Sequence, residues 1–208
     1  MKSYLASLRR SSDVSWIKAC RLPPAAIPLG SLSLPALYEF KAPYDRLVKA
    51  ITSALIAGLL ALIAGFSYLA LSEREIAGFI ALAIVIVITI PTLIIPYLYS
   101  PRAFGITVKG ILVRRPLKSF LIPYEDIISV RRVSWTWKGI RLFASGGLYG
   151  YFGLFQISGL GRAWMYVTNR DKMLLIETKR GVKYIISPSD PQLFMEKLKS
   201  MGVTVEGL

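Results

Sequence analysis

The side chains most often used in catalysis are scarce in this chain of 208 residues. It contains no histidine, which excludes triads with a histidine base, imidazole metal ligands and histidine acid–base chemistry. Cys20 is the only cysteine, which excludes an internal disulfide and a zinc site of several thiolates. Glu125 and Asp126 are neighbours that would point to opposite faces of a strand. We therefore expect no enzyme, no metal site, no cofactor and no small-molecule substrate.

Basic side chains are the abundant polar groups. From residue 99 onward there are 17 basic and 7 acidic residues, a formal net charge of +10. Such a surface attracts lipid phosphates or an acidic protein partner. We interpret two clusters as candidate binding sites for either. The first consists of Arg114, Arg115 and Lys118, and the second of Arg131, Arg132, Lys138 and Arg141 around the interface aromatics Trp135 and Trp137.

The charge pattern leaves several interpretations open. It fits recognition of a lipid headgroup, general attraction to an anionic membrane, or a protein partner. Arg131 and Arg132 alternate across a strand, so only one of them can share a face with the first cluster. Nucleic acid is not expected as a partner, because the sequence shows no nucleic-acid-binding module.

Glycines and aromatic residues are interleaved between Ala144 and Gly161. One interpretation is a mobile aromatic loop that enters the membrane interface or grips a partner. The other is a hairpin whose aromatic side chains complete a core. The second interpretation is favoured for Phe152 and Phe155, whereas Tyr149 fits either and is a third candidate interface aromatic.

Two apolar runs determine the class of protein. Residues Ala50 to Leu71 and Ile76 to Tyr97 each have 22 residues and no charged side chain. A helix needs ~20 such residues to cross a membrane. A buried helix pair in a soluble protein is the competing interpretation, but such helices usually carry a polar stripe. The sequence therefore predicts a transmembrane hairpin.

The distribution of charge orients this hairpin. The connecting loop contains one basic residue, Arg74, between two glutamates, whereas basic residues are frequent on either side of the two runs. The positive-inside rule then places both termini in the cytoplasm and the turn outside. Neither run contains an ionisable acid or base, which argues against an ion or substrate path within the hairpin.

Small residues indicate how the two helices could pack. Ala57, Ala61 and Gly65 lie four residues apart on the first helix, and Ala77 and Ala81 repeat the spacing on the second. Small residues at this period let helix backbones approach closely in lipid. The alternative is that alanine and glycine are simply common in membrane spans.

From residue 103 onward, short runs rich in β-branched and aromatic residues alternate with turn residues. This pattern predicts an antiparallel sandwich or barrel, with a hairpin turn at Lys109-Gly110. A final amphipathic helix is predicted over 192–201, with Asp190 as N-cap and Gly202 as the stop. Its predicted apolar residues are Leu193, Phe194, Leu198 and Met201. The expected strands are 104–108, 111–115, 119–122, 127–133, 150–157, 162–167, 173–178 and 182–186.

About seven strands followed by one helix is the element order of a pleckstrin-homology (PH) domain. Tyr124 to Ile127 with Val130, and Ser187-Pro188 ahead of Asp190-Pro191, resemble the bacterial and archaeal PH-like domains over residues 103–202. The resemblance implies a PH-like antiparallel β-barrel or sandwich with a C-terminal helix, often preceded by two membrane helices. It also implies a binding scaffold, whose function has to be argued from a site.

We expect three parts: an N-terminal segment over 1–49, the membrane hairpin over 50–98 and a small β domain over 99–208. The first part is rich in proline yet too apolar for a solvated tail, so we expect it to lie along another surface. Asparagine, glutamine and cysteine are rare, which indicates a thermophilic, archaeal origin, although membrane spans show the same scarcity. The leading hypothesis is a non-enzymatic membrane-anchored adaptor or accessory subunit that contacts lipids and a membrane-protein partner or a second copy. The alternative is a module that senses phospholipid headgroups at the cytoplasmic face.

Overall fold

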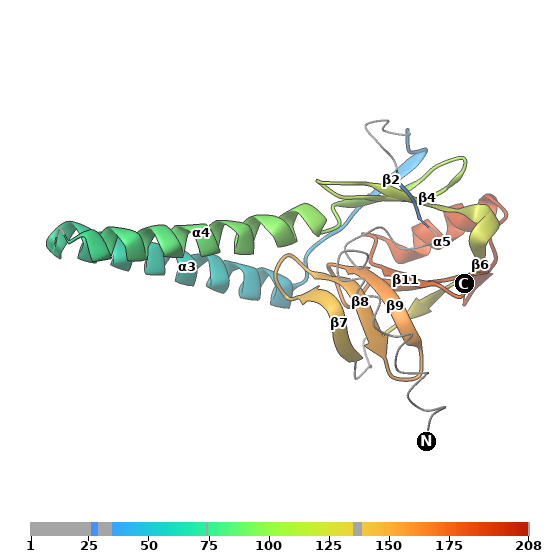
Figure 1. Ribbon diagram of the computed structural model, residues 1–208. Helices are drawn as coiled ribbons and strands as arrows, with labels where there is room; N and C mark the ends of the chain where they lie inside the picture. The colour runs from blue at the N-terminus through green and yellow to red at the C-terminus, as the bar shows by residue number, and fades with distance from the viewer. Residues whose placement is uncertain (1–25, 29–34, 74, 135–138, 208) are drawn as a thin grey trace, which may run out of the picture.

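The computed structural model describes residues 26–28, 35–73, 75–134 and 139–207. Two long helices lie side by side and project from a β-rich domain (Figure 1). They are α3, Arg46–Glu73, and α4, Ile76–Tyr99. Each helix extends beyond its predicted apolar run at the end that joins the β-rich domain. The predicted helical hairpin is therefore confirmed, and its helices are longer than predicted.

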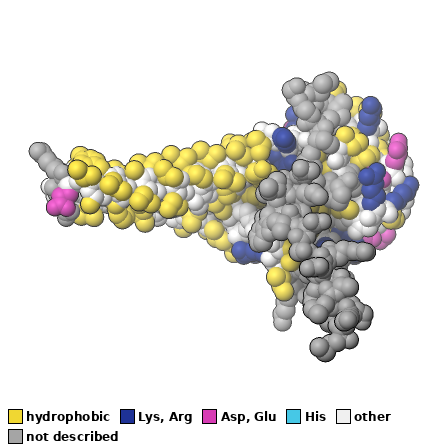
Figure 2. Space-filling model, in the orientation of Figure 1, with side chains coloured by type: hydrophobic (Ala, Val, Ile, Leu, Met, Phe, Trp, Pro, Cys, Tyr) yellow, Lys and Arg dark blue, Asp and Glu magenta, His cyan; other side chains and the backbone are white. Residues whose placement is uncertain are grey.

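Apolar side chains cover the visible surface of the hairpin along its length (Figure 2). Both helices are long and apolar enough to cross a membrane, and only 6% of the most apolar window of each is buried. A core helix of a soluble protein would be mostly buried, so that interpretation does not fit. The hydroxyls of Ser67 and Thr92 donate to Ile63 O at 2.8 Å and to Ile88 O at 2.7 Å, which satisfies them within their own helices.

The two helices pack along one stripe of each, with buried and half-buried positions at steps of three and four residues. They approach closely near the turn, where a Cβ built on Gly78 would lie 3.0 Å from the Cα of Ala70. The stripe consists of Thr52, Ile56, Leu59, Ile63, Phe66 and Ala70 on α3, and of Gly78, Leu82, Val85, Thr89, Leu93 and Pro96 on α4.

The predicted packing stripe is a different surface. Ala57, Ala61, Gly65 and Ala77 are exposed, and only Ala81 is half-buried. Nothing lies within 4 Å of a Cβ built on Gly65. The four exposed residues therefore do not form the contact between α3 and α4. The facing stripe is instead made mainly of large apolar side chains, which spacing between small residues does not reveal.

The first sheet has five strands in the order β1-β5-β4-β3-β2, all antiparallel. Two of them precede the hairpin in sequence, so part of the N-terminal segment does lie along a surface, namely the edges of this sheet. The strands are β1 Ile27–Pro28, β2 Tyr38–Lys41, β3 Ala103–Ile106, β4 Gly110–Arg114 and β5 Phe120–Pro123.

The hairpin is an insertion between two paired strands. β2 and β3 are neighbours in the sheet, yet α3 and α4 separate them in sequence. Lys41 pairs with Ala103, and the N–H of Ala42 donates to Arg102 O at 3.0 Å. The expected division begins the β domain at residue 99, whereas β2, a strand of its first sheet, precedes the hairpin. Pairing across so long a separation leaves no local pattern in the sequence.

The predicted β-hairpin between β3 and β4 is present, but its turn residues are Val108-Lys109 and not Lys109-Gly110. The N–H of Thr107 donates to Gly110 O at 3.0 Å, which places Gly110 in β4. A Cβ built on Gly110 would lie 2.1 Å from the carbonyl oxygen of Ile122. Glycine is thus required for the close approach of β5, and not for the turn.

The second sheet has seven strands in the order β12-β6-β10-β11-β9-β8-β7. Two pairs, β9 with β11 and β12 with β6, are parallel, which the expected antiparallel sheet did not include. Strands β7 and β12 were not predicted. The strands are β6 Ile127–Val133, β7 Gly139–Gly146, β8 Tyr151–Ile157, β9 Gly161–Val167, β10 Met173–Thr178, β11 Lys183–Ile186 and β12 Val205–Glu206.

The predicted C-terminal helix is α5, Pro191–Ser200. Asp190 caps it, since its Oδ1 accepts from the N–H groups of Gln192 and Leu193, both at 3.1 Å. The predicted apolar face is partly wrong, because Leu193 is exposed whereas Met195 is buried. The main core lies between the two sheets and α5. Its largest fully buried side chains include Phe104, Phe120, Tyr184 and Phe194.

A second apolar cluster lies on the other face of the seven-stranded sheet. It includes Met165, Leu175 and Ile185, whose chain neighbours point into the main core. Val48, in the first turn of α3, is buried in this cluster, and Tyr44 packs against it. The beginning of the first membrane-length helix is therefore part of the packing of the domain.

Candidate functional site at the root of the hairpin

The hairpin root is the region in which α3 begins and α4 ends against the domain. We use the name for residues 44–52 and 96–102, together with the loops 115–119, 147–150 and 168–170 that contact them. Basic side chains lie at this border between the apolar hairpin and the domain (Figure 2). The root is where the chain brings its helices, both sheets and several arginines together.

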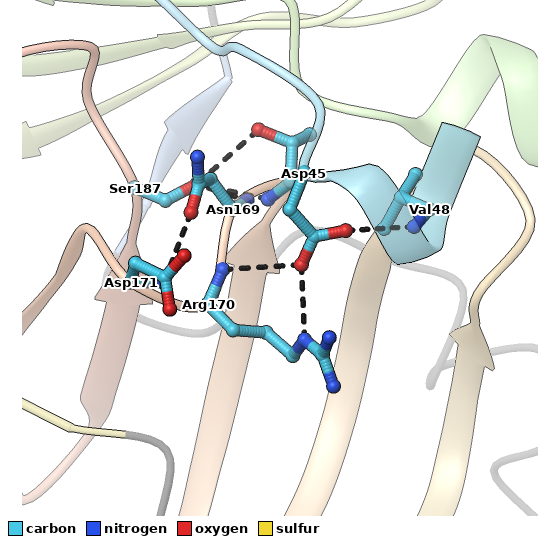
Figure 3. Close-up of polar contacts among 7 residues, drawn as sticks. Asp45, Val48, Asn169, Arg170, Asp171 and Ser187 are labelled. Carbon is cyan, nitrogen blue, oxygen red and sulfur yellow. Dashed lines mark hydrogen bonds and ion pairs between the residues drawn. The ribbon is translucent and has the colours of Figure 1, made fainter. Parts of the chain in front are cut away.

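Asp45 joins α3 to the seven-stranded sheet (Figure 3). Its Oδ1 accepts from the N–H of Val48 at 2.7 Å, which caps the helix. Its Oδ2 accepts from Nε of Arg170 at 2.9 Å, and its own N–H donates to Thr168 O at 3.0 Å. The bond to Asp45 raises the pKa of the Arg170 guanidinium. One buried carboxylate thus holds both the helix start and the turn after β9.

Ser187 holds the same turn from the other side (Figure 3). Its buried Oγ accepts from the N–H of Thr168 at 2.8 Å and of Asn169 at 3.3 Å. Asn169 Oδ1 in turn accepts from the N–H of Asp171 at 2.9 Å, as in an Asx turn. Ser187 belongs to the Ser-Pro pair on which the family resemblance partly rests. Its role in the structure is to fix the turn that carries Arg170.

The loop between β7 and β8 packs against both helices. The N–H of Tyr149 donates to Thr52 Oγ1 at 3.1 Å on α3, and Ser100 Oγ, just after α4, donates to Tyr149 O at 2.7 Å. The Tyr149 ring meets the Tyr97 ring edge-on, with centroids 5.5 Å apart. Tyr149 has a φ of 54°, a left-handed conformation that is uncommon outside glycine. The loop therefore packs on the protein's own hairpin, which does not fit the interpretation of Tyr149 as part of a mobile aromatic loop.

Arg102 lies among tyrosines where α4 ends. Its guanidinium carbon is 4.1 Å from the ring centroid of Tyr97 and 5.9 Å from that of Tyr44, and Nη1 donates to Tyr44 Oη at 2.8 Å. The other terminal nitrogen, Nη2, is buried and has no hydrogen-bond acceptor among the described residues. A buried guanidinium nitrogen without an acceptor is costly.

Arg115, on the loop after β4, has a similar aromatic setting. Its guanidinium carbon lies 5.0 Å from the ring centroid of Phe120 and 5.6 Å from that of Tyr166. Its Nε donates to Lys118 O at 2.8 Å. Burial lowers the pKa of the Arg115 guanidinium. In the described part of the chain, no carboxylate lies within ion-pair distance of Arg115 or of Arg102.

In the first predicted basic cluster, one of the three basic side chains has an acidic partner. Arg114 pairs with Glu39 at 3.6 Å across the first sheet, whereas Lys118 is exposed near Arg115. In the second cluster, Arg131 pairs with Glu177 at 4.0 Å. Arg132 is exposed beside it on β6.

The second predicted cluster is not a single patch along its sheet. Arg131 and Arg132 lie on β6 and Arg141 on β7, and four strands separate β6 from β7 in the sheet order. Arg141 lies against Gly146, where a Cβ would come within 2.7 Å of the guanidinium carbon. Trp135, Trp137 and Lys138 lie outside the described residues.

Other acids also have structural partners. Glu125 and Asp126 lie in the short 3₁₀ helix η1, Tyr124–Asp126, and not in a strand as predicted. Asp126 Oδ1 accepts from Arg180 Nε at 3.2 Å.

Of the root residues that the sequence did not single out, Asp45 had a local signal, because it stands directly before a helical run as an N-cap does. Arg170 and Thr52 had none, since their partners are distant in sequence.

Comparison with known protein families gives a match over the second half of the chain. Residues 102–202, slightly less than half of the chain, match the family model of the bacterial PH domain. No curated protein and no solved structure matches the chain. The match covers β3 to α5 and ends just after the helix, but it does not include β1 and β2, the two edge strands of the first sheet.

Proposed function

We propose that this protein is a non-enzymatic, membrane-anchored adaptor or accessory subunit of a membrane protein complex, since residues 102–202 match the family model of the bacterial PH domain. α3 and α4 anchor it, and the basic domain faces the cytoplasm with both termini. The domain and the hairpin then contact a membrane-protein partner or a second copy. PH-like domains are binding scaffolds, which is consistent with this role.

The insertion of the hairpin between β2 and β3 carries the proposal. The chain enters α3 and leaves α4 from two paired strands, joined by the bond from Ala42 N–H to Arg102 O at 3.0 Å. A domain on a flexible linker samples many orientations. Two paired strands, the Asp45–Arg170 ion pair and the 147–150 loop instead hold this domain in one orientation to the helices. A fixed orientation suits a subunit that presents a binding surface at a set height above the membrane.

Extraction from native membranes tests the adaptor function. The full-length tagged protein, extracted in a mild detergent, should elute as a complex larger than one copy, and native mass spectrometry should resolve a defined stoichiometry. A control membrane protein with the same tag sets the background of non-specific association. Elution as a lone monomer under every mild condition would contradict the proposal.

A headgroup-sensing module is the second candidate, and it is favoured by Arg102 and Arg115, which have no carboxylate partner among the described residues. Retention of one anionic lipid class by the full-length protein should then survive moderate salt. Uniform loss of all anionic lipids as salt rises would leave only non-specific attraction, because screening acts on every exposed charge alike. The full chain is required, since a fragment from residue 99 lacks β2.

A further inference from the structure

The outer face of the seven-stranded sheet is the face that does not contact the main core. Strands β8, β9, β10 and β11 point alternate side chains to the two faces, and apolar residues are buried on both. Met165, Met173, Leu175 and Ile185 are buried on the outer face. An apolar sheet face is buried where another layer of protein covers it. The outer face therefore has a covering layer.

The start of α3 covers one end of this face. Apart from the sheet strands and the β8–β9 turn, the apolar side chains of this cluster are Tyr44 and Val48 among the described residues. The N–H of Asp45 donates to Thr168 O at 3.0 Å, just after β9. α3 then passes the 147–150 loop, which precedes β8, and continues away from the sheet (Figure 1). The helix thus covers only the beginning of β8 and the end of β9.

The buried face extends well beyond that end. Tyr151 pairs with Val167 near α3, and Ile157 pairs with Gly161 at the far end of β8 and β9. Six residues of strand place Ile157 about 20 Å from Tyr151. Yet Phe155 is only 5% exposed and Ile157 only 2%. A second segment of chain is needed to cover the far end.

The lengths of chain outside the described residues indicate which segment this is. Residues 29–34 join β1 to β2 on the first sheet, and 135–138 join β6 to β7 of the second. Four residues are fewer than the six or so that span about 20 Å. Residues 1–25 are long enough, and they lead into Ala26, which packs against the main core. Their large apolar side chains include Leu5, Leu8, Val14, Trp16, Ile17 and Leu22.

We propose that residues 1–25 dock on the outer face of the seven-stranded sheet, over β8 and β9, and complete the domain. Their apolar side chains pack against Phe155, Ile157 and Met165. The segment is joined to the same domain at Ala26, so its effective concentration at this face exceeds that of a partner or a second copy. The docking goes beyond the proposed function and does not depend on it. A partner of the adaptor then binds a different surface.

Photo-crosslinking from Cys20 tests the docking. Cys20 is the only cysteine and lies in the segment, so a benzophenone maleimide attaches to the full-length protein at this position alone. The labelled protein is illuminated in a mild detergent, as a mixture of normal and isotopically heavy chains, and crosslinked peptides are identified by mass spectrometry. We expect crosslinks within one chain to residues 151–167.

Three results of this experiment would overturn the proposal. Crosslinks between normal and heavy chains would identify a second copy as the occupant of the face. Crosslinks to detergent or co-extracted lipid would place the segment in the membrane. Crosslinks confined to α5 or the first sheet, or the absence of any to the seven-stranded sheet, would place the segment elsewhere.

Methionine oxidation measures the cover from the side of the sheet. Met165 lies on the outer face and Met195 in the main core, and both are buried. Val14→Ser with Trp16→Ser and Ile17→Ser should release the segment in the full-length protein. Oxidation of Met165 by dilute peroxide should then be about tenfold faster or more, because oxidation follows exposure. Oxidation of Met195 should not change, and an unchanged rate at Met165 would contradict the docking.

The matched control replaces three basic residues of the same segment, as Arg9→Ser with Arg10→Ser and Lys18→Ser. It should leave the oxidation rate of Met165 within about twofold, since no buried apolar group is lost. Equal acceleration by both triple variants would overturn docking through apolar contacts. Faster oxidation of Met165 and Met195 together would report loss of the whole fold, and the crosslinks of the unchanged sequence then decide.

Discussion

At the scale of single residues, Asp45 makes two contacts that can be separated. One oxygen caps α3 and the other pairs with Arg170. The carboxylate is nearly buried, with 8% of the side chain exposed, whereas 29% of Arg170 is exposed. The cap is local to the helix, but the pair joins the helix to the turn after β9. Asp45 is therefore the residue whose loss should loosen the root most directly.

Two substitutions distinguish these contacts. Asp45→Asn keeps a good N-cap but removes the charge, and should cost about 1–2 kcal/mol of stability. Asp45→Ala removes both and should cost about 1 kcal/mol more. Thermal unfolding of the full-length protein in detergent measures the difference. Equal effects of the two variants would show that the cap contributes nothing.

Two tyrosines, half-buried Tyr124 and buried Tyr166, make stability depend on pH at alkaline pH. Burial raises the pKa of Tyr124 and of Tyr166 to about 12, above the value of about 10 for a free tyrosine. Between these values the unfolded chain has lost protons that the folded chain retains. Stability is therefore full below about pH 10 and falls as pH rises towards 12.

Tyr124→Phe tests this dependence, because the Tyr124 hydroxyl donates to Thr107 O at 2.9 Å outside the membrane helices. The variant should lose some stability at pH 8, where the bond is intact. Its stability should then fall less steeply between about pH 10 and 12, by up to about 1.4 kcal/mol per pH unit. Denaturant unfolding at several pH values measures both slopes, and identical slopes would refute the assignment.

At the scale of elements, the close approach of α3 and α4 near the turn depends on one small residue, Gly78. The Cβ of any larger residue at position 78 would lie 3.0 Å from Ala70 Cα, and Ala70 is fully buried. Helices in lipid associate through close packing and not through the hydrophobic effect. The end of the hairpin far from the domain should thus be sensitive to side-chain size on one face only.

Gly78→Leu should separate the helices near the turn, whereas Ala77→Leu, on an exposed position, is the matched control. We expect faster hydrogen exchange in the peptides around residues 66–82 for Gly78→Leu and unchanged exchange for the control. Similar exchange in both variants would mean that the two helices do not pack through this face.

At the scale of the whole molecule, the hairpin and the domain are one framework. The paired strands β2 and β3 lie directly before α3 and directly after α4 in the sequence. Val48 of α3 is buried in an apolar cluster of the seven-stranded sheet. Orientation of the helices in the membrane therefore sets orientation of the domain. The turn and the domain should lie on opposite sides of the membrane, since the helices separate them.

Cysteine labelling in intact cells tests this topology. In a Cys20→Ser background, a cysteine in place of Glu75 should react with a membrane-impermeant maleimide. A cysteine in place of exposed Lys179 should react only after the cells are opened. The reverse pattern would invert the orientation, and labelling of both sites in intact cells would contradict a membrane-spanning hairpin.

Much of the fold was predictable because it depends on contiguous residues. Apolar length predicts the helices, Asp190 and Gly202 predict the limits of α5, and alternation with turn residues predicts most strands. The prediction missed β1, β2, β7 and β12, and the two parallel pairs. Of the site, the sequence indicated Arg115, Lys118 and Tyr149 as candidates. It also grouped with them Arg114 and Arg131, which have acidic partners.

The sequence by itself determined that the chain has a membrane-length hairpin, a basic β domain and no histidine chemistry, since length, charge and composition are properties of the chain itself. Only the tertiary structure decided that the hairpin is inserted between β2 and β3. It also decided which arginines are neutralised. Arg114 meets Glu39 and Arg170 meets Asp45 across long stretches of chain. An ion pair depends on distance in space, and strand pairing across the hairpin sets that distance.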